Sequence, residues 1–243
     1  MTTVRIVAAT HTGSVRTRNE DCYGATSLAA SRTDGEVVSV EVSKLPCCAV
    51  VADGLGGHPA GDIASAVAVE SVLAEESKTA SDLVAAVHRA NQAVVDAMAQ
   101  HENSVGMGST VAAVLANGSE LTVVNVGDST VFELENDRLV QLSTDDSPVG
   151  VSILPGLPAA TVTQSLGGSP QLAAIDPHVY QDAFAPPRRL LLSTDGLTNF
   201  VPRHELTNAL RQNDAVQVVD RLLALAIEAG APDNVTCVLM DLR

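Results

Sequence analysis

Three aspartates in this sequence share one kind of position, at an end of a short apolar run. Asp53 follows the run 46–52, Asp195 comes shortly after the run 189–193, and Asp233 precedes the run 235–242. A carboxylate in such a place is partly desolvated by the core beneath it, so it needs a cation or hydrogen-bond donors. Carboxylate oxygens without histidine or cysteine nearby favour Mg²⁺ or Mn²⁺ over Zn²⁺. Several of them together can hold two ions.

Glycine follows two of these aspartates, at Gly54 and Gly196. A glycine there lets the backbone turn sharply and approach a ligand closely, because it carries no Cβ. A single Asp-Gly pair is more typical of an ordinary turn. Three acids at strand ends, together with a further acidic segment, favour a metal site over three unrelated turns.

That further segment is 16–21, Arg-Thr-Arg-Asn-Glu-Asp, where Glu20 and Asp21 stand beside two guanidinium groups. The planar fork of an arginine donates two parallel hydrogen bonds to phosphate oxygens. The segment can therefore bring a phosphate clamp beside the metals. Taken alone, a run of this composition is more typical of a solvated loop with weak ion pairs.

The fold that must position these residues is expected to be one domain spanning residues 1–243. Hydrophobic residues make up 46% of the chain and are spread along its whole length, whereas aromatic residues make up 2% and tryptophan is absent. Alanine, valine, leucine and isoleucine must therefore fill a core of layered sheets and helices. The four cysteines show no Cys-x-x-Cys spacing, so we expect buried thiols in a reducing compartment.

Charge and apolar run length limit the partners and the location. The net charge is −15 and no basic cluster is longer than Arg188-Arg189, which argues against nucleic acid as a partner. No stretch of ~18 apolar residues occurs, and the N-terminus lacks a charged region followed by a long apolar one. We therefore expect a cytoplasmic protein with no membrane partner.

Apolar patterning predicts short strands and amphipathic helices along the whole chain. Strands are expected at 4–9, 37–42, 46–52, 109–116, 120–126, 131–134, 138–142, 189–193 and 235–242, and helices at 62–73, 81–101, 203–211 and 215–229. Breakers in 143–161 predict a surface loop. The local signals are hairpin turns at Asn117-Gly118 and Asn136-Asp137 and a cap for the second helix at Ser81 with Asp82.

Six short motifs, in order along nearly the whole chain, resemble the metal-dependent PPM family of protein serine/threonine phosphatases, also called type 2C, in its bacterial form. Each motif alone is weakly specific, and six in one order are far more specific. They are Gly13-Ser14-Val15-Arg16 leading into Asn19-Glu20-Asp21, Asp53-Gly54-Leu55-Gly56-Gly57-His58 with Gly61, Gly108-Ser109-Thr110, Gly127-Asp128-Ser129, Ser193-Thr194-Asp195-Gly196-Leu197 and Asp233-Asn234-Val235-Thr236.

The resemblance implies an α+β fold, a four-layer α-β-β-α sandwich with two central antiparallel sheets flanked by helices and two Mn²⁺ or Mg²⁺ ions at one edge. It implies hydrolysis of phosphoserine and phosphothreonine in proteins that are substrates of serine/threonine kinases, by a water that the two ions activate. The residues that the resemblance assigns are Asp53 bridging both ions, Asp195 and Asp233 on one ion, the Gly54 carbonyl on the other, Glu20 and Asp21 directly or through water, Asp128 and Asn234 behind these ligands or through water, and Arg16 binding phosphate.

Four residues depart from the family pattern. Thr130 and Gln164 stand where arginine is usual, and Asp146 stands where histidine is usual. Asn199 occupies the place where bacterial members commonly carry an aspartate for a third metal. A neutral amide binds Mg²⁺ or Mn²⁺ more weakly than a carboxylate, so we expect poor occupancy of a third site.

Two further features weaken the match near the reacting group. Leu55 stands where eukaryotic members have a histidine, which leaves no evident general acid, and His58 equally suits a helix-start or packing role. The loop 147–161 is shorter than the family's usual flap, so substrate selection by a flap is not expected.

Two competing interpretations remain open from the sequence. A pseudophosphatase of the same fold would bind phosphoproteins without hydrolysis, as the four departures permit. A dinucleotide-binding domain would use the glycines after Asp53, but a carboxylate directly before them would repel a pyrophosphate unless a metal intervened.

Overall fold

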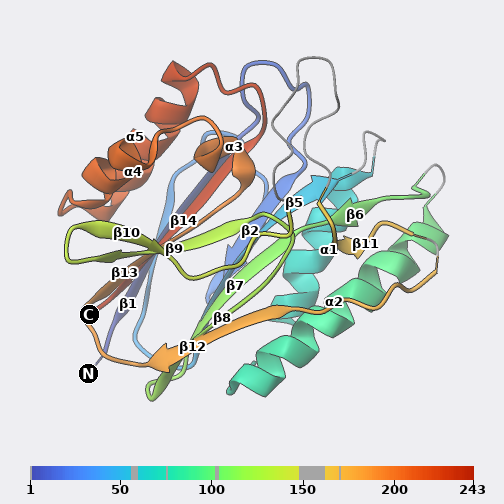
Figure 1. The fold of residues 1–243 in the computed structure, drawn as a ribbon, viewed down its shortest axis with the longest axis horizontal. Coiled ribbons are helices and arrows are strands. Elements are labelled where there is room, and N and C mark those ends of the chain that lie inside the picture. Colours follow the sequence, from blue (N-terminus) through green and yellow to red (C-terminus); the bar gives the residue numbers. More distant parts are fainter. Residues whose placement is uncertain (1, 56–59, 75, 102–103, 148–161, 170) are drawn as a thin grey trace.

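Two antiparallel sheets lie face to face, and helices cover the outer face of each sheet (Figure 1). The structure is a computed structural model that describes residues 2–55, 60–74, 76–101, 104–147, 162–169 and 171–243. The predicted α-β-β-α sandwich is therefore confirmed. A dinucleotide-binding domain would need a parallel sheet, and every paired strand here is antiparallel, so that alternative is wrong.

The first and last strands of the chain are neighbours in the middle of the first sheet. Thr3 and Arg243 exchange two backbone hydrogen bonds at the outer end of this pair. The strand order is β10 (Arg138–Gln141), β9 (Thr130–Glu135), β13 (Arg188–Ser193), β14 (Val235–Leu242), β1 (Val4–His11) and β4 (Val38–Val42).

The second sheet is centred on β5 (Cys47–Leu55), which pairs with β2 on one side and with β6 and β7 on the other. Its order is β3 (Leu28–Ser31), β2 (Asp21–Ala25), β5, β7 (Val111–Ala116), β8 (Glu120–Val126) and β12 (His178–Ala183), while β6 (Gly108–Ser109) also pairs with β11 (Leu166–Gly167).

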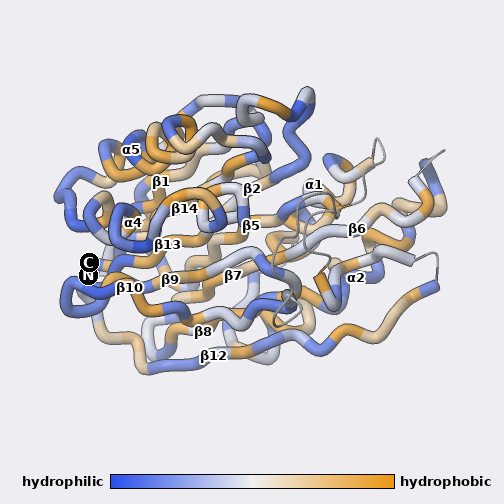
Figure 2. Tube along the Cα trace, turned by 45° about the horizontal axis from the view of Figure 1, so that its top comes forward, coloured by the Kyte–Doolittle hydropathy of each residue, from blue (hydrophilic) through white to orange (hydrophobic). Residues whose placement is uncertain are grey.

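Each sheet has its own pair of long helices. α1 (Gly61–Leu73) and α2 (Ala80–Gln100) cover the second sheet, and α4 (Arg203–Leu210) and α5 (Ala215–Glu228) cover the first. The short helix α3 (Asp195–Thr198) follows β13 directly. Hydrophobic residues dominate the central strands, whereas the outer helices mix both kinds (Figure 2). Among the described residues, no helix is both long enough and apolar enough to cross a membrane.

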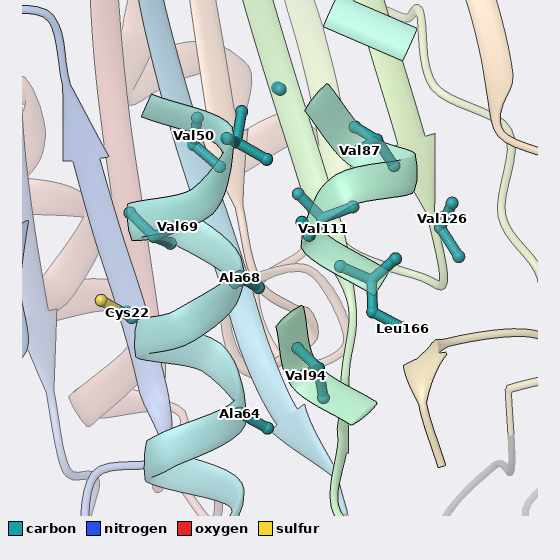
Figure 3. Close-up of a cluster of buried hydrophobic side chains, with 14 of the residues drawn as sticks. Cys22, Val50, Ala64, Ala68, Val69, Val87, Val94, Val111, Val126 and Leu166 are labelled. Carbon is teal, nitrogen blue, oxygen red and sulfur yellow. The ribbon is translucent and has the colours of Figure 1, made fainter. Parts of the chain in front are cut away.

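Small side chains fill three apolar layers. Along β5, Cys47, Ala49 and Val51 face the other sheet, and the residues between them face α1 and α2. Figure 3 shows this outer layer, where Ala68 and Val69 of α1 lie beside the sheet. Because both faces of the central strands are buried, these strands are apolar at successive positions rather than at alternate ones. The four cysteines are free and buried, as predicted.

The predicted strands and long helices all form, with ends shifted by a few residues. Both hairpin turns are confirmed: Asn136 and Asp137 have φ of 46° and 64°, and Gly118 has φ of 94°. The predicted cap at Ser81 is wrong, because Thr79 caps α2 and forms a reciprocal pair of hydrogen bonds with Asp82. Most of the predicted loop, 148–161, and His58 lie outside the described residues.

Candidate active site

Strand pairing brings acids from distant parts of the sequence to one edge of the sandwich. In the ladder between β2 and β5, Asp21 stands directly opposite Asp53. Asp195 begins α3 directly after β13, and Asp233 lies just before β14, the strand that pairs with β13. These four acids are close enough for the other three to affect the ionisation of Asp53.

The carboxyl groups of Asp53 and Asp195 are difficult to ionise at this edge. Burial, followed by the charges of neighbouring aspartates, raises the pKa of Asp53 well above its ordinary value. Burial and then the charge of Asp233 raise the pKa of Asp195. A divalent cation beside these two carboxyl groups would relieve the repulsion, so the pair fits a metal ion.

Asp21 is the most deeply buried of these acids, with none of its surface exposed. Its Oδ2 accepts hydrogen bonds from the hydroxyls of Thr194 at 2.8 Å and Thr236 at 2.7 Å. Its Oδ1 has no hydrogen-bond partner among the described residues. Burial raises the pKa of Asp21 to about 7, against the two hydrogen bonds. A buried carboxylate oxygen without a donor fits a cation, or a water bound to one.

Thr110 fixes the backbone at Asp53. The Asp53 N–H donates to the Thr110 hydroxyl at 2.9 Å, and the Thr110 N–H donates to the Asp53 carbonyl at 2.9 Å. The Thr110 and Ser129 hydroxyls are 2.6 Å apart. Through Thr110, the end of β5 is connected to the turn between β8 and β9. The end of β5 is thereby held by two directional bonds and a buried hydroxyl pair.

Gly54 is a site of close backbone approach and lies inside β5, so the sharp turn predicted after Asp53 is wrong. A Cβ on Gly54 would lie 2.1 Å from the carbonyl oxygen of Gly61 and 2.7 Å from that of Glu20. The Gly54 N–H donates to the Glu20 carbonyl at 3.1 Å. Burial raises the pKa of the Glu20 side chain. The missing side chain therefore lets β5, the start of α1 and Glu20 lie against one another.

Asn234 ties the segment 12–20 to this edge. Its side-chain amide donates to the carbonyl oxygens of Thr12 at 2.7 Å and Arg18 at 2.8 Å. Its Oδ1 accepts from the Glu20 N–H at 2.9 Å. Three directional bonds to separate residues identify Asn234 as a residue that positions the segment.

The guanidinium of Arg16 reaches the acids from this segment. Its Nη2 lies 2.7 Å from Asp233 Oδ2, and 47% of the arginine side chain is exposed. Glu20 and Asp53 also act on its charge. Arg16 therefore lies beside the acids, and in this structure it is paired with Asp233.

α3 holds Asp195 against the start of β14. A Cβ on Gly196 would lie only 1.9 Å from the carbonyl oxygen of Asn234, so only glycine allows this approach. The side-chain amide of Asn199 donates to Asp195 Oδ2 at 3.0 Å. Asn199 thus presents an N–H donor to this carboxylate.

The turn that carries Asp128 is held by a side chain from another part of the chain. Asp146 accepts from the Gly127 N–H through Oδ2 at 2.8 Å, and its own N–H donates to the Gly127 carbonyl at 3.1 Å. Asp146 Oδ1 in turn lies 2.8 Å from His178 Nε2 and 2.9 Å from Gln164 Nε2. Two of the departures from the family pattern therefore form one network with His178, a residue that the sequence did not single out.

Asp128 belongs to the same electrostatic group as the acids on β5 and α3. Burial raises its pKa to about 7, and the charge of Asp195 adds to the rise. No three acidic, histidine or cysteine side chains of the described chain converge as a complete set of metal ligands. A cation here would therefore need backbone carbonyl oxygen and water in addition to carboxylates.

Comparison with known proteins identifies the family. A model described as protein phosphatase 2C matches residues 30–240. The serine/threonine phosphatase stp of Listeria monocytogenes is 30% identical over 210 residues, which cover 79% of this chain and 83% of stp. The serine/threonine protein phosphatase PstP of Mycobacterium tuberculosis is 28% identical over 98% of this chain, but the chain spans only 45% of PstP.

The fold agrees with these matches. The crystal structure of the catalytic domain of PstP in complex with two manganese ions superposes with a TM-score of 0.80 at 27% identity, covering all of this chain and 99% of that one. The antiparallel sandwich with acids at one edge is therefore the fold of a PPM phosphatase domain. The chain belongs to the protein phosphatase 2C family.

Proposed function

We propose that this chain hydrolyses phosphoserine and phosphothreonine in proteins with two bound Mn²⁺ or Mg²⁺ ions. The observation that carries the proposal is the buried cluster of carboxyl groups, in which Asp21 stands opposite Asp53 and keeps one oxygen without a partner in the described chain. Divalent cations would neutralise such a cluster. Family membership and the two manganese ions of PstP add support.

The site residues that we propose form two groups. The direct ligands are the Asp53 carboxylate for both ions, Asp195 and Asp233 for one ion, and the Gly54 carbonyl oxygen for the other. The supporting residues are Glu20 and Asp21, directly or through water, and Asp128 and Asn234 behind them or through water.

When bound, two divalent ions would lower the pKa of a water molecule and neutralise charge on the phosphoryl oxygens. The contribution of the chain itself is placement. Thr110 holds the backbone at Asp53, and Thr194 and Thr236 orient Asp21. Side chains fixed in this way need little reorganisation when charge develops during the reaction.

Arg16 would bind the phosphate of the substrate through its planar fork. Its ion pair with Asp233 is half-exposed and therefore contributes little to stability. A cation on Asp233 would compete for the same carboxylate and release the guanidinium toward the substrate. Metal binding and phosphate binding would thus support each other at this residue.

A third ion is expected to bind poorly. Asn199 donates an N–H to Asp195, and a neutral amide attracts a divalent cation less than a carboxylate would. We further propose that the partners are phosphorylated proteins made by serine/threonine kinases, that the role is in cytoplasmic signalling, and that nucleic acid is not a partner, in line with the charge of −15.

Hydrolysis of 4-nitrophenyl phosphate and of a phosphothreonine peptide should require Mn²⁺ or Mg²⁺ and stop in EDTA. The physical reason is that the clustered carboxyls cannot all ionise without cations. Initial rates across a Mn²⁺ titration, with calorimetry on the same samples, provide the measurement. Calorimetry should resolve two tight sites, and three comparable tight sites would contradict the argument from Asn199. Full turnover in EDTA would contradict the proposed function.

Replacing Asp146 with alanine should lower turnover by about 10- to 100-fold, the usual cost of losing a residue that orients a metal site. The variant loses the bond to the Gly127 N–H, which fixes the turn of Asp128. The Mn²⁺ concentration for half-maximal rate should rise. His178→Gln is the matched control, because glutamine keeps a donor for Asp146, and it should change the rate by less than about threefold. Equal losses in both variants would show that Asp146 does not act through the turn.

The pseudophosphatase alternative finds no support. All four departures that motivated it have defined partners: the Thr130 hydroxyl lies 3.1 Å from that of Ser193, Gln164 donates to Asp146, and Asn199 donates to Asp195. The relatives are named phosphatases.

A further inference from the structure

An open surface cavity of 420 Å³ is lined by residues of α4 and of the hairpin of β9 and β10. Figure 1 shows these elements on the side of the first sheet that α4 and α5 cover. The lining of the cavity contains three arginines and a histidine against a single acid, in a chain with 29 acidic and 14 basic residues. The lining residues are Asp137, Arg138, Leu139, Arg203, His204, Thr207, Asn208 and Arg211.

Asp137, the single acid in the lining of this cavity, is already paired with Arg211. Arg211 Nε lies 3.0 Å from Asp137 Oδ1, its Nη2 donates to the Asp137 carbonyl at 3.0 Å, and its Nη1 donates to Asn208 at 3.2 Å. In the described part of the chain, Arg138 and Arg203 form no ion pair or hydrogen bond through their guanidinium groups. The guanidinium N–H groups of these two arginines are therefore available to bind a ligand in this cavity.

Arg203 is held in place by an aromatic ring. Its guanidinium carbon lies 5.0 Å from the ring centroid of Phe132, a buried residue of β9. This cation–π contact fixes the plane of the guanidinium without using its N–H donors. Less rotational freedom is then lost when an anion binds.

A second arginine-lined cavity, of 490 Å³, adjoins the first and shares Asp137 and Arg211 with it. In this second cavity Arg188 pairs with Glu133 and Arg189 pairs with Asp241. These two arginines therefore form structural ion pairs and are not free to bind a ligand.

Other acids near the first cavity are Glu135, opposite Arg138 in the hairpin, and Glu205, 4.0 Å from His204. Burial raises the pKa of Asp145, another nearby acid, although the charge of Arg203 is close enough to oppose this rise. Among the arginines that line the first cavity, Arg138 and Arg203 are therefore the two whose guanidinium groups have no hydrogen bond or ion pair in the described chain.

The position of the cavity relative to the acidic edge is set by β9. This strand starts at Thr130, just after Asp128, and runs past Phe132 to the turn at Asn136. At ~3.3 Å per residue, Phe132, which contacts Arg203, and Glu135, which stands opposite Arg138, lie roughly 13 Å and roughly 23 Å along the chain from Asp128, a mean of about 18 Å. An extended peptide covers that span in about five residues.

We propose that this cavity binds a second phosphate group of the same substrate segment, about five residues from the phosphate that is hydrolysed. The inference rests on the proposed function and extends it to substrates with two phosphates. A phosphate dianion suits two unpaired guanidinium forks. Elsewhere the net charge of −15 repels phosphopeptides, so a local positive site gives them a place to dock.

The test compares the double variant Arg138→Gln/Arg203→Gln with the parent on three substrates. These are 4-nitrophenyl phosphate, a peptide with one phosphothreonine, and the same peptide with a phosphoserine five residues away. The KM for the doubly phosphorylated peptide should rise about tenfold, as expected for loss of a charge-assisted bond, with unchanged kcat. The other two KM values should stay the same. Arg203→Lys, which keeps the charge without the fork, should give an intermediate KM.

The matched control is Lys44→Gln/Arg221→Gln, which removes two positive charges outside both cavities. An equal KM rise in this control, or a rise on all three substrates, would overturn the proposal. So would no rise in a folded double variant. Glutamate in place of the phosphoserine should not restore the parent's KM, and full restoration would assign the cavity to acidic side chains.

Binding without hydrolysis separates this proposal from the proposed function. In EDTA, the fluorescent doubly phosphorylated peptide should still bind the parent more tightly than it binds the arginine double variant, as measured by anisotropy. Equal binding would overturn the second phosphate site even if the enzyme hydrolyses the peptide. Displacement of the peptide by an unphosphorylated RNA oligonucleotide as effectively as by a second phosphopeptide would do the same.

Discussion

Asp53→Asn is expected to lower turnover of 4-nitrophenyl phosphate by about 10³-fold, because metal ions contribute several kcal/mol of transition-state stabilisation and each 1.36 kcal/mol is tenfold. The same variant should be at least as stable as the parent in EDTA. Its amide removes a buried negative charge that Asp195 and Asp21 otherwise oppose. A lower rate together with equal or higher stability distinguishes a lost metal ligand from a damaged fold.

The measurements are the rate across a Mn²⁺ titration and the midpoint of thermal unfolding in EDTA. Asp220→Asn is the matched control, because it removes an exposed negative charge on α5 that is not among the charges raising the pKa of Asp53. The control should leave the rate and the midpoint unchanged. Near-parental rates in Asp53→Asn would exclude Asp53 as the bridging ligand.

Gly196→Ala should damage both stability and turnover. The new Cβ would lie 1.9 Å from the Asn234 carbonyl oxygen, so the backbone of α3 or of the segment before β14 must move. Overpacking of this kind costs about 1–3 kcal/mol. Displacing Asp195 by roughly 1 Å should lower the rate about 100-fold.

Urea unfolding and initial rates check this result. Thr198→Ala, on the same short helix but with a partly exposed side chain, is the control and should have a small effect. A Gly196→Ala protein with parental stability and rate would mean that the contact between α3 and Asn234 relaxes without cost.

The sequence predicted the central strands well because they are buried on both faces. Runs such as 46–52 and 235–242 are apolar at successive positions and rich in β-branched residues, which is typical of central strands. The long helices were equally clear, because α2 and α5 carry apolar residues at helical spacing.

The elements that the sequence analysis did not predict lack these signals. β2 begins with Asp21 and contains Gly24, both unfavourable in strands, yet it is buried at every position. A Cβ on Gly24 would lie 2.8 Å from side-chain atoms of Val69 and Leu73, so a larger residue would force these side chains of α1 to shift. β12 is a mostly exposed edge strand, and α3 has only four residues.

The acids of the candidate site could be selected from the sequence, but their supporting hydroxyls could not be given roles. Thr110, Thr194 and Thr236 each lie inside one of the motifs, where a threonine is compatible with an ordinary strand or turn. Only strand pairing reveals that two of them converge on Asp21. His178 had no signal at all, since its contact with Asp146 joins residues far apart in sequence.

The hydrogen-bonded pair of Thr3 and Arg243 has a mechanical consequence. β1 and β14 run antiparallel, so residues 3 and 243 lie at the same end of the ladder. A force that separates these two residues would open the ladder one pair at a time instead of shearing all pairs together. Opening would proceed from Val4 and Leu242 and reach the pair of Thr10 and Thr236 near its end. The threonine that holds Asp21 would therefore be among the last parts of this ladder to yield to tension.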